Sequence, residues 1–276
     1  MTNNPLRLTV FLRDYTTLRI GGQAELWQVN SIDAIRQATV EPFKVLGGGS
    51  NLLVSDKGVR ERVIKLGHSF NNIAALNGTT NFWIGAATPL PGLVRRAQRQ
   101  GISGLEGLFG IPGVVGGAVI MNAGTRFGSI ADTLTEVELF IDGNLHRLAA
   151  SELGLGYRTS NLPSNSIVVR AHLSLVPSDP ERVARAMASV DEARKGQPKN
   201  KSAGCAFKNP PGQSAGFLID QAGLKGLRVG DAMVSHEHGN FIVNLGSATQ
   251  QDVLALIAEI QSRVEIPLEL EWRGWV

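Results

Sequence analysis

A glycine stands at every third position over one stretch of the sequence, and this spacing most constrains what the chain can form. The glycines of the stretch are Gly101, Gly104, Gly107, Gly110, Gly113 and Gly116, and Gly117 follows directly. A collagen-like helix is excluded because the stretch is short and contains little proline. We expect a loop that leads into the start of a buried helix of small residues. The start of such a helix is an anion-binding site.

Three further glycines, Gly47, Gly48 and Gly49, lie between two apolar runs. Consecutive glycines allow backbone N–H groups to converge on a diphosphate, because no Cβ atoms stand in the way. Ser50 and Asn51 then add short hydrogen-bonding side chains. Three glycines alone are equally consistent with a flexible turn, since glycine interrupts regular structure in loops of every kind.

Neither glycine segment has the spacing of a Walker loop or of a Rossmann fingerprint. Two such segments in one chain indicate one extended ligand with a diphosphate at its centre. FAD fits this description better than a mononucleotide does. The spacing of the glycines does not by itself identify a flavin.

The composition favours a soluble enzyme that binds a small molecule. The 276 residues, of which 43% are hydrophobic and 18% charged, suffice for two globular domains. The net charge of +3 is spread along the chain, which argues against a nucleic-acid partner and is compatible with a phosphate-bearing ligand. No apolar run approaches the roughly 20 residues that cross a bilayer, and no secretory signal is recognisable. We expect a cytoplasmic protein without a membrane partner.

The order of the expected elements indicates an α/β or α+β layer structure. Strands are expected at residues 25–30, 44–46, 135–141, 167–175 and 268–275. Helices are expected after Ser31, at residues 93–100 and 181–195, and from a capping box that begins at Thr249. The pair Asp142 and Gly143 predicts a hairpin turn. The composition changes at residues 177–180, and a domain boundary is placed after Leu175.

Six motifs, in order along the chain, resemble one known family. They are TTLRIGG (16–22), VLGGGSNLLVSD (45–56), GLEGLFGIPGVVGGAVIMNAG (104–124), YRTS (157–160), SAGCAFKNP (202–210) and AGLKGLRVGDAMVSHEHGNFIVN (222–244). The chain resembles the UDP-N-acetylenolpyruvoylglucosamine reductases, whose FAD domain is of the vanillyl-alcohol-oxidase type. The resemblance covers residues 15–273, and the short chain is similar to the compact subtype, which lacks a substrate-covering insertion.

The resemblance implies an α+β fold with an FAD-binding domain at residues 1–175, divided into lobes at about 1–62 and 63–175. A smaller substrate-binding domain with a closing strand would follow at residues 176–276. The implied reaction is the NADPH-dependent reduction of UDP-N-acetylglucosamine enolpyruvate to UDP-N-acetylmuramate through non-covalent FAD, in the synthesis of peptidoglycan precursor. The implied partners are the UDP-sugar and NADPH, and we expect a monomer.

The resemblance also assigns ligand-binding residues. Those for FAD are Leu46, Gly47, Gly48, Gly49, Ser50, Asn51, Pro112, Gly113, Gly116, Gly117, Asn122, Ala123 and Gly124. Those for the substrate are Asn209, Lys208 and Lys225. Lysine near a diphosphate has an electrostatic rationale.

Three residues are candidates for catalysis. Hydride addition to an enol ether leaves negative charge beside the carboxylate, so the site needs cationic or hydrogen-donating groups and a proton source. The resemblance assigns charge stabilisation to Arg158 and Glu271. It assigns proton donation to Cys205, which stands where the family most often has serine. A thiol, with a reference pKa of about 8.5, is an easier donor than an alcohol at neutral pH.

Each of these residues also has a purely structural interpretation. Arg158 could pair with a surface carboxylate, Glu271 could be an outward-facing strand residue, and Cys205 could be a small buried hydrophobe. His236 and His238 would share one face of a strand, but no third ligand is in view, and we expect no metal site. Alternative functions are another FAD-linked oxidase or dehydrogenase of the superfamily, and a nucleotide-binding module without catalysis.

Overall fold

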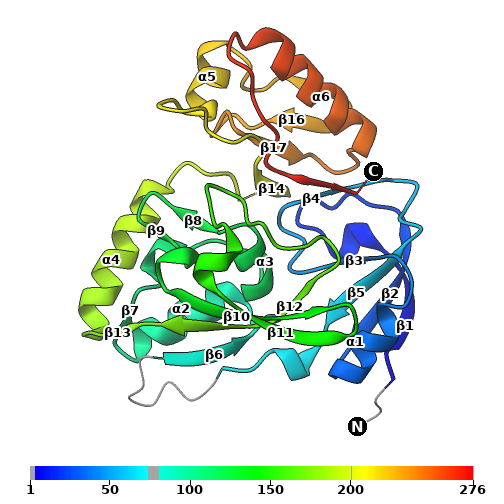
Figure 1. Ribbon diagram of the computed structural model, residues 1–276. Helices are drawn as coiled ribbons and strands as arrows, with labels where there is room; N and C mark the ends of the chain where they lie inside the picture. Colours follow the sequence, from blue (N-terminus) through cyan, green and yellow to red (C-terminus); the bar gives the residue numbers. More distant parts are fainter. Residues whose placement is uncertain (1–3, 74–80, 200, 276) are drawn as a thin grey trace. The chain divides into compact units, whose positions relative to one another are not determined.

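The computed structural model describes residues 4–73, 81–199 and 201–275. The chain forms two compact units. Unit 1 consists of Met1–Leu8, Leu26–Gly48 and Arg62–Lys195, and unit 2 consists of Thr9–Glu25, Gly49–Glu61 and Gly196–Val276. Both units combine helices with strands (Figure 1), so the predicted α+β fold class is confirmed.

Several of the helices begin at residues whose side chains cap them. The α-helices are α1 (Ile32–Ala38), α2 (Leu90–Arg99), α3 (Val115–Ile120), α4 (Pro180–Ala193), α5 (Ala215–Gln221) and α6 (Gln250–Arg263). The 3-10 helices are η1 (Leu12–Asp14), η2 (His68–Phe70), η3 (Glu106–Leu108), η4 (Ile130–Asp132) and η5 (Ala150–Leu153). Ser31 caps α1 as predicted, since its hydroxyl accepts a hydrogen bond of 3.1 Å from the N–H of Ala34. Thr249 and Asp252 form the predicted capping box of α6.

Two four-stranded sheets and two strand pairs belong wholly or mainly to unit 1. The first sheet has the order β1 (Leu6–Phe11), β2 (Gln23–Val29), β5 (Arg62–Leu66), β3 (Phe43–Val45). The second has the order β11 (Asn144–Ala149), β10 (Leu134–Ile141), β12 (Ile167–Ser174), β6 (Asn81–Gly85). The pairs are β13 (Val176–Pro177) with β7 (Ile102–Ser103), and β8 (Gly124–Thr125) with β9 (Gly128–Ser129). The predicted hairpin turn joins β10 to β11, and Asp142 and Gly143 have φ values of 49° and 84°.

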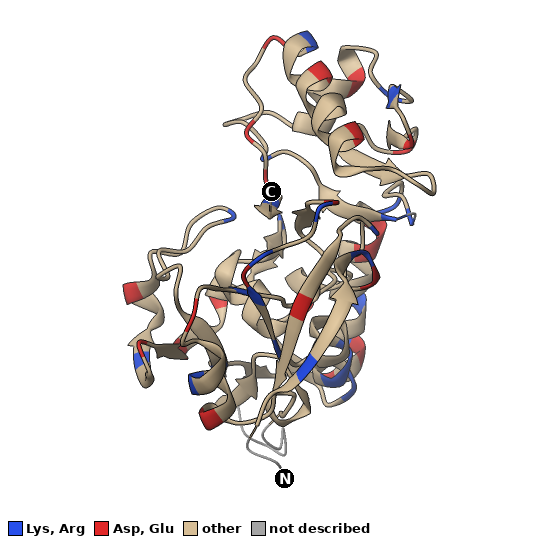
Figure 2. Ribbon diagram, turned by 90° about the vertical axis from the view of Figure 1, so that its right-hand side faces the viewer, with Lys and Arg blue, Asp and Glu red and all other residues tan. Residues whose placement is uncertain are grey.

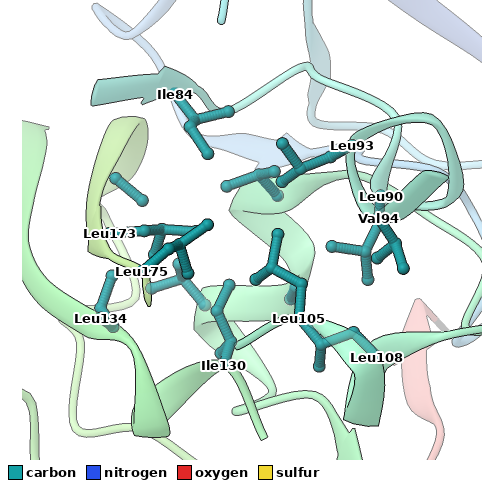
Figure 3. Packing of buried hydrophobic residues seen from close by; sticks show 14 of the residues in the cluster. Ile84, Leu90, Leu93, Val94, Leu105, Leu108, Ile130, Leu134, Leu173 and Leu175 are labelled. Carbon is teal, nitrogen blue, oxygen red and sulfur yellow. The ribbon is translucent and has the colours of Figure 1, made fainter. Parts of the chain in front are cut away.

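Two clusters of buried apolar residues stabilise unit 1. In the larger cluster, α2 and α3 pack on the second sheet, and Figure 3 shows Ile84, Leu93 and Leu173 among its members. In the smaller cluster, residues of α1 and β5 meet Phe140 and Ile167 of the second sheet. The second sheet is therefore covered on both faces, which fixes the positions of the loops that leave its ends.

Unit 2 contains a four-stranded antiparallel sheet and one parallel strand pair. The sheet has the order β14 (Ser202–Cys205), β17 (Phe241–Asn244), β16 (Ala232–Val234), β15 (Arg228–Val229). The pair is β18 (Arg273–Trp275) with β4 (Leu52–Val54). The core of the unit joins Leu53 to the apolar face of α6, so β4 belongs to this unit although it lies early in the sequence.

The predicted closing strand is shorter than expected. It was expected over residues 268–275, but only Arg273–Trp275 forms β18, and Leu270 makes a single bridge to Phe207. The prediction of a helix at 93–100 was more accurate. α2 begins earlier, at Leu90, and Gly101 follows its end with a φ of 63°.

The boundary between the compact units lies after Lys195, whereas the sequence placed a domain boundary after Leu175. α4 belongs to unit 1 because Val183 and Met187 on its apolar face pack into the larger cluster. Two early segments, Thr9–Glu25 and Gly49–Glu61, belong to unit 2. The pairing of β4 with β18 could not be read from local sequence, since it joins segments far apart in the chain.

Acidic and basic residues are interspersed over the ribbon, as Figure 2 shows, instead of gathering in one block. A well-buried ion pair lies on the second sheet, where Glu138 accepts hydrogen bonds from Arg170 (2.8 and 3.0 Å) and Arg147 (3.3 Å). Burial alone would raise the pKa of the Glu138 carboxyl, but the hydrogen bonds and charges of the two arginines outweigh it and lower that pKa. In the described part of the chain, no helix is both long and apolar enough to cross a bilayer.

Candidate active site

The two glycine segments meet in unit 1. A Cβ atom added at Gly48 would lie 2.5 Å from the Cα atom of Gly113, and one added at Gly47 would lie 3.2 Å from a methyl group of Val114. The backbones can approach this closely only because side chains are absent. The structure therefore brings together two segments that the sequence predicted to bind one diphosphate.

Gly49 belongs to unit 2, and there too the backbone requires glycine. Its φ is 65°, and a Cβ atom would lie 1.9 Å from the carbonyl oxygen of Tyr15. The carbonyl of Gly49 accepts a hydrogen bond of 3.0 Å from the N–H of Thr17. The segment at residues 16–22 thus holds the end of the glycine loop in place.

The start of α3 differs from the expected anion site. The N–H of Val115 donates to the carbonyl of Thr88 at 3.0 Å, and the N–H of Gly116 donates to Ala86 at 2.9 Å. These two donors are engaged with protein carbonyls, and α3 is a helix of only six residues. A Cβ atom added at Gly117 would have no neighbour within 4 Å, so the surface beside Gly117 is open.

One charged side chain lies directly beside the glycine loop, and the sequence analysis did not single it out. Lys65, on β5, donates a hydrogen bond of 3.1 Å from its Nζ to the carbonyl of Gly47. Burial lowers the pKa of the Lys65 ammonium. Its only signal in the sequence is a lysine inside the apolar strand that ends at Leu66.

The turn that carries Arg158 is hydrogen-bonded to the end of α3 and to the segment after it. The Asn122 amide donates to the carbonyl of Gly156 at 2.9 Å, Arg158 donates to Gly124 at 2.8 Å, and the Ser160 hydroxyl donates to Ile120 at 2.8 Å. Two predicted FAD-binding residues, Asn122 and Gly124, are thus partners of the turn that carries a predicted catalytic residue.

The backbone of Arg158 itself is in the left-handed region, with a φ of 57°. A residue with a Cβ atom adopts this conformation at an energetic cost, and such strain is often found at functional sites. The turn is closed by hydrogen bonds in both directions between Gly156 and Thr159. The backbone of this turn therefore sets the direction in which the Arg158 side chain leaves the chain.

In unit 2, the structure brings the segments of Cys205 and Glu271 together. The N–H of Glu271 donates a hydrogen bond of 2.8 Å to the carbonyl of Ala206, the residue after Cys205. The Asn51 amide donates to the carbonyl of Glu271 at 3.3 Å. Cys205 is half-buried at the end of β14, which differs from the fully buried hydrophobe of the structural interpretation.

The predicted substrate-binding residues lie in unit 2 and have protein partners. The carbonyl oxygen of the Asn209 side chain accepts a hydrogen bond of 3.0 Å from the N–H of Ala215, at the start of α5. Lys208 pairs with Glu269 at 2.6 Å, and Lys225 pairs with Asp220 at 2.7 Å.

His236 and His238 lie in the loop between β16 and β17 and not in a strand, so they do not share a strand face. The Nδ1 atom of His238 accepts a hydrogen bond of 3.1 Å from the N–H of Asn240. Burial, followed by the charge of Lys225, lowers the pKa of the His238 ring. Among the described residues, no group of three acidic, histidine or cysteine side chains is placed to hold a metal ion.

Comparison with known proteins identifies the family. Residues 197–273 match the model of the UDP-N-acetylenolpyruvoylglucosamine reductase C-terminal domain, and residues 28–149 match that of an FAD binding domain. The chain is 60% identical over 266 residues to the UDP-N-acetylenolpyruvoylglucosamine reductase of Thermus thermophilus, which covers 96% of this chain and 98% of that protein. It is 50% identical over 272 residues to the enzyme of that name from Deinococcus radiodurans, with coverage of 96% and 94%.

A solved structure agrees over nearly the whole chain. The crystal structure of the reductase MurB from Thermus caldophilus is 59% identical and superimposes with a TM-score of 0.94, covering 99% of this chain and 100% of that one. The chain belongs to the UDP-N-acetylenolpyruvoylglucosamine reductase family. The predictions of the family and of an FAD-dependent reductase are thereby confirmed.

The residues of this reductase fit FAD. Gly48 and Gly113 leave a surface without side chains at which backbone groups can face a diphosphate, and Lys65 adds one cation beside Gly47. FAD would be held there by these loops. The individual FAD-binding residues from Leu46 to Gly124 stay a prediction, as do the catalytic and substrate-binding residues.

Proposed function

We propose that this chain catalyses the NADPH-dependent reduction of UDP-N-acetylglucosamine enolpyruvate to UDP-N-acetylmuramate, with Cys205, Arg158 and Glu271 as its catalytic residues. The observation that carries the proposal is the hydrogen bond from the Glu271 N–H to the carbonyl of Ala206. It puts a candidate proton donor and a candidate carboxylate on neighbouring backbone segments, although they are far apart in the sequence. The relatives' shared name supports the choice of substrate.

The chemistry that FAD supplies when bound is the transfer of two electrons from NADPH to the vinyl group of the substrate. The chain's own residues have other tasks. The Arg158 guanidinium is always charged, and in this proposal it binds the substrate carboxylate as negative charge develops beside it. The Cys205 thiol then gives its proton to the carbon next to that carboxylate, and a thiolate remains on Sγ.

Glu271 and the substrate-binding residues complete the proposal. The Glu271 carboxylate acts with Arg158 to stabilise the intermediate that forms at the reacting carbon. Asn209, Lys208 and Lys225 bind the nucleotide and sugar, and the lysines exchange their present partners, Glu269 and Asp220, for phosphate. In this proposal the FAD-binding domain includes residues 28–149 and the substrate-binding domain includes residues 197–273, which are the ranges that match the two family models. We further propose a cytoplasmic monomer without a nucleic-acid partner.

The test separates the two half-reactions by stopped-flow absorbance without air. NADPH should bleach the flavin of the wild-type enzyme, and UDP-N-acetylglucosamine enolpyruvate should restore its colour. Cys205→Ala should leave the bleaching unchanged and slow the restoration by about 10²-fold or more, as expected when a positioned general acid is removed. Restoration at the wild-type rate would exclude Cys205 as the proton donor. Restoration by oxygen but not by the sugar nucleotide would instead favour another FAD-linked oxidase.

A further inference from the structure

A buried amide grips the backbone next to Cys205. Asn240, which is 2% exposed, lies in the turn before β17. Its Nδ2 donates a hydrogen bond of 2.8 Å to the carbonyl of Phe207, and its Oδ1 accepts one of 2.9 Å from the Phe207 N–H. The amide therefore both donates to and accepts from the backbone of a single residue, Phe207, as a residue of a paired strand would.

The backbone of Asn240 extends this grip toward the thiol. Its carbonyl accepts a hydrogen bond of 2.8 Å from the N–H of Ala206, and the next residue, Phe241, is the register partner of Cys205. On its other side, the carbonyl of Ala206 accepts the hydrogen bond from Glu271. Ala206 thus lies between Asn240 and Glu271, and any movement of Asn240 is passed to the segment that bears Cys205.

Residues of its own turn hold Asn240 in place. Its N–H donates to the Nδ1 of His238 at 3.1 Å, and the ring stacks edge-on against Phe241 with a centroid distance of 4.9 Å. Gly239 allows the turn to approach α5 closely, because a Cβ atom there would lie 2.6 Å from the carbonyl of Gly216. These contacts hold the Asn240 amide in a single orientation.

We propose that Asn240 is a positioning residue, which sets the place of the Cys205 thiol and of the Glu271 segment by clamping Phe207. The inference rests on the proposed function, because Cys205 and Glu271 are the groups whose placement matters there. It goes beyond that function because no role has been given to residues 235–244, the part of the 222–244 motif in which Asn240 lies. Asn244, four residues later, provides the comparison.

Asn244 is also a buried amide, 4% exposed, but it grips other residues. Its Nδ2 donates to the carbonyl of Leu18 at 3.0 Å, and its Oδ1 accepts from the N–H groups of Gly246 and Ala248. Asn240→Asp, directly before β17, and Asn244→Asp, at the end of β17, therefore make the same chemical change. Each keeps the accepting oxygen and replaces the donor that faces a backbone carbonyl.

The first measurement is the stopped-flow pair of half-reactions on the FAD-loaded variants. For Asn240→Asp at neutral pH we expect bleaching by NADPH at the wild-type rate and restoration by the enolpyruvyl sugar nucleotide about 10²-fold slower, the cost of a misplacement of about 1 Å. The slow restoration should recover as the pH is lowered, because a buried carboxyl beside a carbonyl has a raised pKa and, once protonated, can donate to Phe207. Asn244→Asp should show neither effect.

The second measurement does not depend on the substrate. Cys205 is the single cysteine of the chain, so alkylation of the folded holoenzyme by iodoacetamide, followed by mass spectrometry, reports on its thiol alone. Its rate should change in Asn240→Asp and stay at the wild-type value in Asn244→Asp. Equal alkylation and equal restoration in the two variants would overturn the clamp. If the sugar nucleotide does not reoxidise the wild-type enzyme, the proposed function fails. The alkylation rates then still show whether Asn240 positions the Cys205 thiol.

Discussion

The glycine loops of unit 1 and the Cys205 segment of unit 2 are built in opposite ways. At the loops, Gly48 and Gly113 come close because neither has a side chain. Beside Cys205, the backbone is held by a side chain, the Asn240 amide, which replaces a strand neighbour. A surface that binds a diphosphate needs exposed backbone, whereas a proton donor needs a fixed position. The two regions should therefore respond to substitution in different half-reactions.

The largest effect is expected where a side chain is added to the loops. In Gly48→Ala the new Cβ atom would meet the backbone of Gly113, and such overpacking typically costs about 1–3 kcal/mol. FAD binding should weaken by about 10- to 100-fold, which corresponds to that cost. The ratio of flavin to protein absorbance after gel filtration measures the loss.

The control is Gly92→Ala in α2, where an added Cβ atom has no neighbour within 4 Å. It should keep its flavin and gain about 0.5–1 kcal/mol of stability, because alanine favours a helix more than glycine does. Full retention of FAD in Gly48→Ala would show that the contact with Gly113 does not shape the cofactor site.

A smaller effect is expected for Lys65, a side chain that supports the loop at Gly47. Lys65→Met removes the hydrogen bond from a charged donor to the Gly47 carbonyl, a contribution on the order of 1.5 kcal/mol. FAD should bind about tenfold more weakly, and the restoration of flavin colour by substrate should be unchanged. Titration of apoprotein with FAD, followed by quenching of flavin fluorescence, gives the dissociation constant.

Lys57→Met is the matched control, because Lys57 is an exposed lysine. It should bind FAD as the wild type does, and Lys65→Arg should recover part of the lost affinity by restoring a cationic donor. If Lys65→Met binds FAD normally, the loop at Gly47 holds its shape without the Lys65 side chain, and the contrast between the two regions becomes sharper.

The smallest effect is expected on the free energy of unfolding at acid pH, through His238, which lies beside Asn240 in unit 2. Burial and Lys225 lower the pKa of His238 below its usual 6.5. The unfolded chain therefore binds a proton at His238 more readily than the folded one, so stability is present above about pH 6.5 and is lost as the pH falls through the folded pKa. Urea midpoints measured from about pH 7.5 to about pH 5.5 should decrease toward acid for this reason.

His238→Gln should flatten this decrease, and His146→Gln, at an exposed strand position, should leave it unchanged. An identical pH dependence in the wild type and His238→Gln would mean that the ring is not the group that titrates.

The sequence predicted those parts of the molecule that depend on neighbours along the chain. The caps at Ser31 and Thr249 and the turn at Asp142 use residues within three or four positions, so their chemistry is visible locally. The glycine segments were also recognisable, because their composition is itself the feature that lets the two backbones approach closely. What could not be predicted are pairings across long separations, such as β4 with β18, and hence the composition of unit 2.

The same reason explains which site residues were overlooked. Lys65 lies inside an apolar strand and Asn240 lies in the turn before one, and their importance comes from the distant carbonyls of Gly47 and Phe207 that they contact. A polar residue in a buried strand is a weak signal, since it has many explanations. Only the fold shows which backbone group it serves.

The way unit 2 is assembled has a consequence for synthesis on the ribosome. Asn51 and its partner Glu271 are 220 positions apart, and Leu53 and Leu18 share their core with α6. As the nascent chain emerges, unit 1 can finish once Lys195 has appeared, but these early apolar segments must wait for the last strand. During that interval they are a target for chaperones, and pausing of translation between residues 195 and 273 would lengthen their exposure.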